Sequence, residues 1–503
     1  MMSQQSLFGH GDGAARDPAA RISSATRYLS GAAYLDEWYA AAVVDRFVAD
    51  RRRAVPPSLG YDLTTVIRHC LRARRLWLAQ NAVVTAILLL GLVVFTAATA
   101  TLVVAGLGWA LILSAPAAYR RWAILAGLAL MAGALALYYR YAPEPGSGVT
   151  VFVGGVLVVV VAVLAALTWS RYRMIMTIAG EPEGPAVSRV EEVEQRLRVI
   201  DTAQHGNILL HAGYDPFVGA GETVGAWSLA TELKPVEDRE PLLNGSGRPV
   251  GVRYVPIDPV ELVGHLRRRL AGLRSRDLPE HERITGLQLR DLVVSPGARW
   301  LIDEGCGVPY SHAAPEAVES VIRAPRPEGR HFLRASVGAA ECQGAVVSTF
   351  VHVAVEGGML YVEVVCAVLA PIRRRYREID AYDRGDRRAM ALREAAIRLM
   401  PAVGLAPLRL VRALGRAAAL RRGRPHECGA PWDVRELAAR TGFANYLQRL
   451  DAEKYRRLID RRATEAIYEF LSASGVGATE LATGAAAPIV SQRAAAITRV
   501  NAS

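Results

Sequence analysis

Lysine, paired cysteines and known metal-binding motifs are scarce or absent in this sequence. Only Lys234 and Lys454 are lysines, so nearly all of the positive charge comes from arginine, and the net charge of +12 is no evidence for nucleic-acid binding. Five scattered cysteines exclude a disulfide-rich secreted protein and indicate free thiols in a reducing compartment. Neither Cys-x-x-Cys nor His-Glu-x-x-His occurs, so no metal site and no cofactor are predicted.

A long uncharged stretch dominates the first third of the chain. Residues 76–118 contain no Asp, Glu, Lys or Arg. As one helix this stretch would extend roughly 60 Å, about twice the hydrocarbon thickness of a bilayer. It therefore predicts a helical hairpin with a break near Thr96–Thr101, followed by two further apolar segments. The predicted spans are 78–97, 100–118, 122–141 and 148–169; no removable signal is visible before them, so internal spans are expected to drive insertion.

Arginine clusters flank these segments and predict their orientation. With four spans, all three clusters fall on one side of the membrane, which the positive-inside rule places in the cytoplasm. We therefore expect a multi-pass protein of the cell (inner) membrane with both termini in the cytoplasm. The residues expected at the anionic inner-leaflet surface are Arg72, Arg74, Arg75, Arg120, Arg121, Arg171 and Arg173.

Ionisable residues are absent from the centres of the predicted spans. Ion and proton pathways usually contain such residues, so a transporter or ion channel is disfavoured. Small residues such as Ala129, Gly133 and Gly154 would let helices approach closely, which allows a homo-oligomer. The alternative is that they are ordinary filling in an Ala/Gly-rich membrane span.

Two helices are expected before the first span. Ser30 is placed to cap a helix that runs to about Arg53, and Asp62 to cap a second helix that leads into the span. A stripe of arginines on this second helix suits anionic headgroups or, equally well, packing against the C-terminal region.

The residues after the spans predict an α+β domain, in which Asp258-Pro259 marks the start of a helix. Strands are expected at 207–211, 226–233, 250–257, 287–294 and 331–337, followed by a hairpin of 346–355 and 359–369. The expected fold class is a membrane protein with four transmembrane α-helices and a cytoplasmic α+β domain with a mainly antiparallel sheet. The predicted units are a cytoplasmic helical arm (1–75), a transmembrane region (76–170), a linker or stalk helix (171–200), the α+β domain (201–372), a helical region (373–474) and a disordered tail (475–503).

Beyond Pro371 the apolar pattern changes to a helical period. Helices are expected at 386–400, 405–422, 432–441 and 443–473. The second of these carries Arg409, Arg412 and Arg416 on one side. It is expected at the inner-leaflet surface or, as the alternative, packed on the sheet with a solvated basic face.

Gly213–Glu222 is the most distinctive segment of the soluble region. Backbone N–H groups at its glycines would be open to a phosphate or another anion. The candidate ligand-binding residues are Gly213, Tyr214, Asp215, Gly219, Gly221 and Glu222. Neither a P-loop nor a dinucleotide fingerprint is matched. The alternative is a structural turn that packs Tyr214 and Phe217 under the sheet.

The same segment resembles part of an uncharacterised family of actinobacterial polytopic membrane proteins. In that family a strand runs into a Gly-Tyr-x-Pro-Phe-Val-Gly-x-Gly turn and then a Trp-Ser strand, as at residues 213–228 here. The juxtamembrane segment Pro57–Leu63 and the arginine-rich composition are also similar. The resemblance implies a polytopic membrane topology and no particular reaction.

These observations favour a non-enzymatic role. The expected function is an integral membrane anchor whose cytoplasmic domain binds a protein partner or a ligand. Such a protein would suit the docking of a cytoplasmic assembly, for example a contractile injection machine, or a stress or cell-death pathway. The alternative is a membrane-bound enzyme that uses Gly213–Glu222 as a nucleotide or phosphate site. No catalytic residue is predicted, because no Gly-x-Ser-x-Gly signature occurs.

Overall fold

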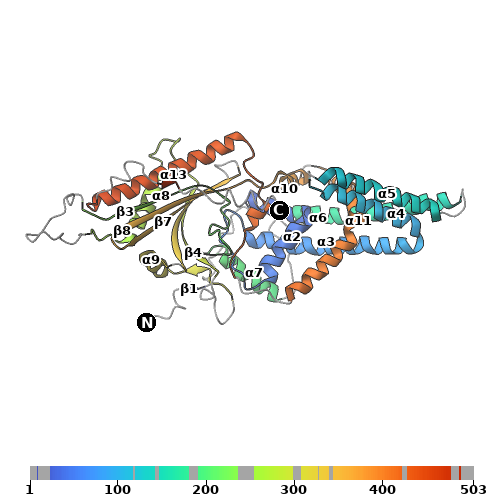
Figure 1. Cartoon of the computed structure of the whole chain (residues 1–503), viewed down its shortest axis with the longest axis horizontal. Coiled ribbons are helices and arrows are strands. Elements are labelled where there is room, and N and C mark those ends of the chain that lie inside the picture. Colours follow the sequence, from blue (N-terminus) through green and yellow to red (C-terminus); the bar gives the residue numbers. More distant parts are fainter. Residues whose placement is uncertain are drawn as a thin grey trace, which may run out of the picture.

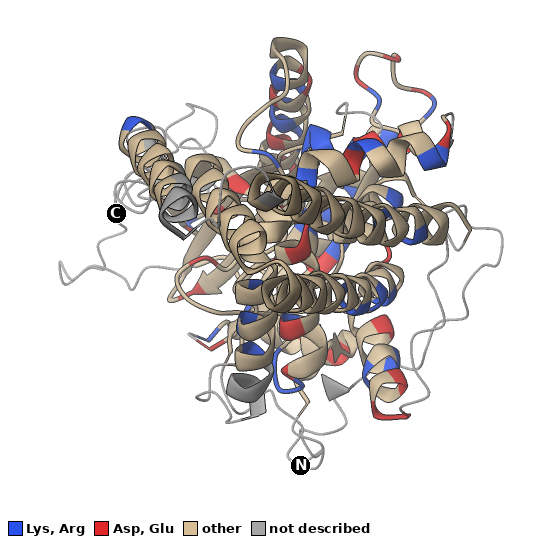
Figure 2. Ribbon diagram, turned by 90° about the vertical axis from the view of Figure 1, so that its right-hand side faces the viewer, with Lys and Arg blue, Asp and Glu red and all other residues tan. Residues whose placement is uncertain are grey.

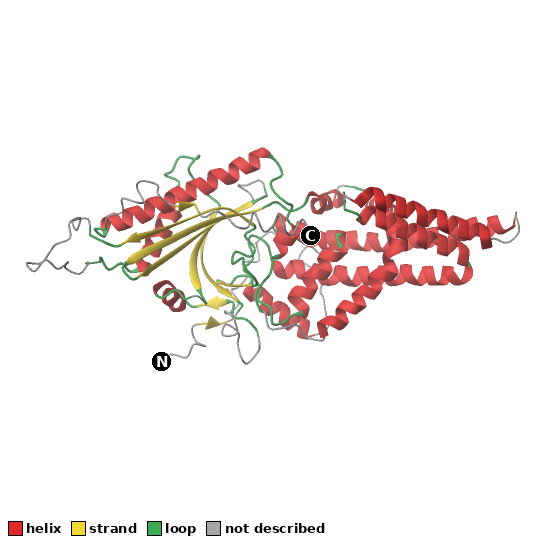
Figure 3. Cartoon of the chain, in the orientation of Figure 1, coloured by secondary structure: helices red, strands yellow, loops and turns green. Residues whose placement is uncertain are grey.

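The molecule is elongated, with long helices at one end and a curved sheet at the other (Figures 1 and 3). Short helices lie between these two ends. The computed structural model describes residues 8–9, 23–116, 119–141, 147–180, 191–235, 254–297, 308–326, 328–338, 344–383, 385–421, 428–476 and 487–488.

Three helices are long and apolar enough to cross a membrane: α3 (Leu63–Val94), α4 (Thr96–Ser114) and α6 (Ser147–Gly180). α3 and α4 form the predicted hairpin, and its break lies at Phe95. A further helix, α5 (Arg120–Tyr141), has an apolar stretch at Arg121–Leu130. Viewed along the molecule from this end, the long helices carry charged residues over little of their length (Figure 2).

Two of these helices continue without a break toward the sheet. The Asp62 carboxylate accepts the backbone N–H groups of Thr64 and Thr65 at 3.0 and 3.3 Å, which confirms the predicted cap of α3. At the same end of the bundle, α6 runs on to Gly180, well past the predicted end of the fourth span at 169. Each helix therefore has an apolar part and a part that packs against the rest of the chain.

Three short helices precede α3 where one was expected: α1 (Ser24–Leu35), α2 (Glu37–Val44) and the π-helix η2 (Asp45–Ala49). Ser30 is buried inside α1. The capping side chains are those of Ser23 and Asp36, which accept backbone N–H groups at the starts of α1 and α2. The prediction of one helix capped by Ser30 is therefore wrong, because Asp36 ends α1 and starts α2.

A hydrophobic core, here called the collar, joins the short helices to α3 and α6. Its buried residues come from α1, α2, η2, the first half of α3, the end of α6, α7 (Glu191–Ala203), residues 372–376 and α12 (Val434–Ala438). Tyr34, Tyr39 and Ile67 are completely buried there. Most of the segment 171–200, interpreted as a linker or stalk, lies in α6 and α7 and contributes residues to this core. The collar is therefore assembled from segments that lie on both sides of the spans in the sequence.

The soluble region contains a mixed seven-stranded sheet in the order β2-β4-β6-β7-β8-β3-β9. β2 and β4 run parallel, and the other neighbouring strands pair antiparallel. The predicted hairpin is confirmed in β7 and β8, where Gly357 and Gly358 take positive φ angles of 57° and 75°. The strands are β2 (Ile208–His211), β3 (Glu222–Glu232), β4 (Leu287–Pro296), β6 (Arg330–Val337), β7 (Val346–Glu356), β8 (Met359–Leu369) and β9 (Ala487–Pro488), and a separate pair joins β1 (Phe8–Gly9) to β5 (His312–Ala313).

Helices cover one face of this sheet. α8 (Pro259–Ala271), α9 (Pro315–Arg323) and α13 (Tyr446–Ala473) pack there in the largest core of the soluble region. α8 starts at the predicted cap, where the Asp258 carboxylate accepts the Val260 N–H at 2.9 Å. The opposite face is covered in part by residues of the Gly213–Glu222 segment. The remaining short helices are η4 (Gly272–Arg274), α10 (Arg374–Arg377) and η6 (Glu378–Asp383).

The largest departure from the sequence prediction is α11 (Arg387–Arg421), a single helix where two were expected. It crosses the bundle obliquely (Figure 1), and its Ala402 and Val403 share a core with residues of α3 and α6. The alternative of a helix packed on the sheet is therefore wrong. A Cβ added to Gly106 of α4 would lie 2.7 Å from the Gly404 nitrogen, so small residues allow α11 and α4 to approach closely.

Smaller predictions also differ. Of the strand expected at 250–257, residues 250–253 lie outside the described residues, and 254–257 form no strand. α12 is shorter than the helix expected at 432–441, because Asp433 caps its start and the chain is extended again at Ala439. Most of the predicted disordered tail at 475–503 lies outside the described residues.

Candidate functional site

The segment Gly213–Glu222 is held on the sheet by an aromatic cluster. The ring of Phe217 lies 5.3 Å from that of Phe332 and 4.5 Å from that of Phe350, measured between centroids. Tyr214 is 86 % exposed, so its predicted packing under the sheet is wrong. Gly221 has φ 84°, and a Cβ there would lie 2.3 Å from the Val368 carbonyl oxygen, which leaves room for glycine alone.

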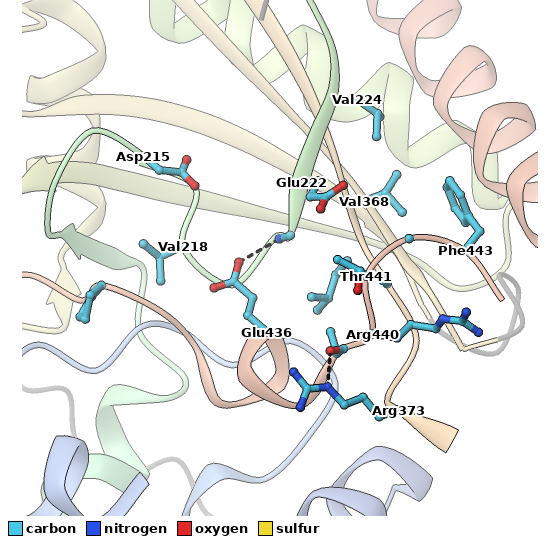
Figure 4. Close-up of a pocket in the computed structure, with 16 residues that line it drawn as sticks. Asp215, Val218, Glu222, Val224, Val368, Arg373, Glu436, Arg440, Thr441 and Phe443 are labelled. Carbon is cyan, nitrogen blue, oxygen red and sulfur yellow. Dashed lines mark hydrogen bonds between the residues drawn. The ribbon is translucent and has the colours of Figure 1, made fainter. Parts of the chain in front are cut away.

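A carboxylate from the same chain occupies the place at which an anion was expected to bind. One carboxylate oxygen of Glu436 accepts the Gly221 N–H at 3.0 Å (Figure 4), and the Gly219 N–H also donates to this side chain. The other oxygen accepts the backbone N–H of Asp433 at 3.1 Å. A phosphate or nucleotide at these glycines would therefore have to displace Glu436.

Asp433 links Glu436 to the residues just before α3. It is buried, and its two carboxylate oxygens accept the Arg435 N–H at 3.1 Å and the Tyr61 hydroxyl at 2.5 Å. With Glu436 it forms a capping box at the start of α12. Tyr61 directly precedes Asp62, the cap of α3. A series of hydrogen bonds therefore leads from Gly221 to the residue that precedes the cap of α3.

Burial raises the pKa of both carboxyl groups. Removal from water raises the pKa of Asp433 to about 6. It raises that of Glu436 to about 7, and the nearby Asp433 charge adds to this second shift. The Arg435 guanidinium lies beside them and donates to the carbonyls of Leu59 and Gly344 at 2.8 and 3.3 Å. Glu436 therefore changes its charge close to neutral pH.

A cavity of about 390 Å³, here called the turn cavity, adjoins Gly221 and α12 (Figure 4). Val224, Val368 and Phe443 supply apolar surface, and Arg440 and Thr441 line it as well. Asp215, Glu222, Arg373 and Glu436 also line the cavity, so it combines apolar surface with charged groups that could orient a small molecule or a side chain of a partner.

The predicted ligand-binding residues are divided between this cavity and the turn itself. Asp215, Gly221 and Glu222 line the turn cavity. Gly213 takes a φ of 78°, and its carbonyl lies 3.0 Å from His211 Nδ1. The Asp215 carboxylate accepts the Phe217 N–H at 3.1 Å, which shapes the turn.

The arginines predicted at the membrane surface lie in different environments. Four are exposed: Arg75, Arg121, Arg173 and Arg412. Two are half-buried, Arg72 and Arg416, and the Arg120 side chain is outside the described residues. Two lie near carboxylates: Arg74 pairs with Asp45 at 2.8 Å, and Arg409 lies 3.7 Å from Glu37. Arg171 is 1 % exposed and pairs with Glu394, so its prediction as a surface residue is wrong.

Sequence reasoning missed Glu436, Asp433 and Tyr61. A local signal was present for the first two, because Asp433-x-x-Glu436 fits the capping-box pattern. Their contacts with Gly221 and Tyr61 bridge distant parts of the chain and leave no local pattern. Within the described ranges, no group of His, Cys, Asp and Glu side chains is arranged to hold a metal ion.

The model of the AbeC-like domain matches residues 226–498, which is more than half of the chain. The chain belongs to the AbeC-like domain family. The matched AbeC-like domain begins inside β3 and includes α11 and α12, and therefore Glu436. Comparison with curated proteins and with solved structures finds no match. The actinobacterial origin, and the Gly213–Gly221 motif as a family feature, stay predictions.

Proposed function

We propose that this protein is an integral membrane anchor whose cytoplasmic α+β region binds a ligand or a segment of a protein partner in the turn cavity. The observation that carries the proposal is the series of hydrogen bonds from Gly221 through Glu436 and Asp433 to Tyr61. It connects the wall of the cavity to the cap of α3. An occupant that contacts or displaces Glu436 would therefore act on the first span.

In this proposal the anchor has four spans, with α5 as the third in chain order. Both termini lie in the cytoplasm, the membrane is the cell (inner) membrane, and its anionic inner leaflet meets exposed arginines such as Arg75, Arg121 and Arg173. The extensions of α3 and α6 support this arrangement, because both lead toward the same collar. Protease added to intact cells should leave a C-terminal tag uncut, and protease added to inverted vesicles should remove it.

The lining of the turn cavity favours binding over catalysis. Glu436 is engaged with backbone N–H groups, and Val224, Val368 and Phe443 add apolar surface to the wall. An apolar side chain of a partner would fit between Val224 and Phe443, with an acidic group near Arg440. A protein partner of this kind suits the docking of a cytoplasmic assembly, such as a contractile injection machine, or a role in a stress or cell-death pathway.

A variant that fills the cavity tests this proposal. Thr441 is exposed, so Thr441→Trp should block the turn cavity and leave the core intact. The full-length protein would be purified from native membranes in mild detergent, and co-purifying proteins quantified by mass spectrometry. We expect Thr441→Trp to recover at least about tenfold less of a stoichiometric partner, as loss of a central anchor residue would cause.

Ser472→Trp is the matched control, because Ser472 is a small, exposed hydroxyl residue at the end of α13, away from the cavity. It should recover the partner as the unmodified protein does. Equal recovery by both variants would show that the turn cavity is not the binding site. The identity of the recovered protein distinguishes docking of an assembly from a stress pathway.

A further inference from the structure

A second cavity, here called the arginine pocket, lies where α11 passes the end of α1. Its volume is about 370 Å³, and it is lined by Leu35, Tyr382, Arg393, Ile397 and Arg398, with Glu378, Ala381, Met390 and Glu394. It adjoins Trp77 of α3, because the Arg398 guanidinium lies over the Trp77 ring at 5.4 Å. Trp77 follows Arg74 and Arg75 at the start of the uncharged stretch 76–118, so the pocket lies where α3 changes from charged to apolar, the level expected for the inner membrane surface.

One acidic group of the arginine pocket is already neutralised. Glu394 pairs with the buried Arg171, whose Nε donates to it at 2.9 Å, and it also accepts the Tyr382 hydroxyl. Arg171 in turn donates to the Tyr34 carbonyl at 2.7 Å. The Glu394 carboxylate therefore already has partners within the chain, and Arg171 balances its charge.

The two arginines of the pocket keep their positive charge available. Arg398 donates one N–H to the Leu35 carbonyl at 3.1 Å, and among the described residues neither Arg398 nor Arg393 forms an ion pair with a carboxylate. Arg393 is exposed. Glu378 also lines the pocket and is exposed, so water screens its charge. Two guanidinium groups that line one cavity are suited to phosphate.

Exposed apolar side chains lie on α11 near these charges, beside the polar Glu378, Glu394 and Tyr382 that also line the pocket. Ile397 is 67 % exposed and Leu392 is 49 % exposed on the same stretch of α11. Further along, α11 packs between the spans, since Ala402 and Val403 share a core with Val84 of α3. Val84 lies about 10 Å beyond Trp77 along the α3 axis. α11 therefore lines the arginine pocket and, a little further along, packs against the apolar part of α3.

We propose that the arginine pocket binds the phosphate of an anionic membrane phospholipid, with Arg393 and Arg398 on the phosphate and Ile397 and Leu392 against the acyl chains. This proposal goes beyond a general attraction of arginines to the inner leaflet, because it assigns one headgroup to one cavity. It depends on membrane insertion and is independent of the turn cavity.

Native mass spectrometry of the detergent-solubilised full chain tests the proposal. Phosphatidylglycerol and phosphatidylcholine would be titrated at matched concentrations, and free glycerol phosphate would be added as a competitor. We expect one saturable phosphatidylglycerol adduct, about tenfold tighter than that of phosphatidylcholine, as a charge-assisted pair would give. Free glycerol phosphate at the same concentration should not displace it, because it lacks acyl chains. Displacement would overturn the assignment to a lipid.

Substitutions in the arginine pocket test whether phosphatidylglycerol binds there. Arg393→Gln, at an exposed residue, should weaken phosphatidylglycerol binding about tenfold without disturbing the fold. Arg398→Gln should also weaken it, but this change removes the contact with Trp77, so Arg393→Gln is decisive. Glu378→Gln should tighten binding only slightly, because water already screens the exposed carboxylate that repels the phosphate. Arg326→Gln, at an exposed residue far from α11, is the control. Unchanged affinity in Arg393→Gln, or equal loss in Arg326→Gln, would overturn the proposal.

Discussion

The collar and the membrane bundle share α3 and α6 but are stabilised by different surroundings. In the collar, apolar side chains from five or more segments bury one another almost completely, as in a soluble protein. In the bundle, only 33 %, 28 % and 17 % of the apolar windows of α3, α4 and α6 are buried inside the chain. The contrast indicates that the collar depends on internal packing, whereas the bundle leaves much of its apolar surface for lipid.

The largest loss of stability is expected from a substitution at the junction of the collar and the bundle. Glu394→Gln removes the ion-pair partner of Arg171 and leaves a buried, uncompensated charge, which should lower the free energy of unfolding by about 3–5 kcal/mol. Thermal unfolding in detergent micelles would measure the loss. The double variant Arg171→Met with Glu394→Leu should recover much of it. A single variant as stable as the original protein would show that Arg171 finds another partner.

Two alanine substitutions on the same helix compare the regions directly. Ile67 is completely buried in the collar, so Ile67→Ala should destabilise the protein by about 2–5 kcal/mol. Leu90 is 66 % exposed in the bundle, so Leu90→Ala should change the stability in lipid nanodiscs by less than about 0.5 kcal/mol. Similar losses of stability in both variants, measured by thermal unfolding, would contradict the view that the collar is stabilised by internal packing and that the bundle surface is stabilised by lipid.

The titration of the Glu436 carboxyl group should make the stability of the protein depend on pH. Its pKa is raised to about 7 in the folded state, so between pH 4.5 and 7 the folded protein holds a proton that the unfolded chain has lost. Stability should therefore fall as the pH rises through this range, by up to about 3 kcal/mol for this group. Glu436→Gln should remove that part of the slope when unfolding is measured from pH 5 to 8. An identical slope in both proteins would contradict the assignment.

The smallest of these effects is expected at the crossing of α11 and α4. Gly404→Leu should force the two backbones apart and cost about 1–3 kcal/mol. Gly133→Leu on α5 is the control, because a Cβ there meets nothing within 4 Å. Thermal unfolding should separate the two variants, and equal behaviour would mean that α11 does not depend on this contact.

Elements specified by neighbouring residues were predictable from the sequence. The uncharged stretch predicted the α3–α4 hairpin, Asp62 its cap, and Glu356-Gly357-Gly358 the β7–β8 hairpin, because each signal lies within a few residues of its effect. α11 was predicted as two helices, whereas it is continuous through Pro401 and Pro407, residues of a type that usually interrupts a helix. Packing against α3, α4 and α6 stabilises the continuous helix instead.

The candidate site was predicted only in part for a related reason. The glycine turn was visible as an anion site, and its amides do bind a carboxylate. That carboxylate is Glu436, more than two hundred residues further along the chain. Arg171 was misplaced at the surface because its partner Glu394 is equally remote. Hydropathy and spacing report local environment, whereas these contacts are set by tertiary packing.

The uninterrupted course of α3 from its Asp62 cap to Val94 has a mechanical consequence. A rigid rod that is fixed at one end in lipid carries its other end along whenever it leans. Thinning or stretching of the bilayer changes the lean of such a rod, because its apolar length must stay within the hydrocarbon. Tyr61, next to that cap, holds Asp433, so tension in the bilayer would strain the bonds that keep Glu436 on the glycine turn.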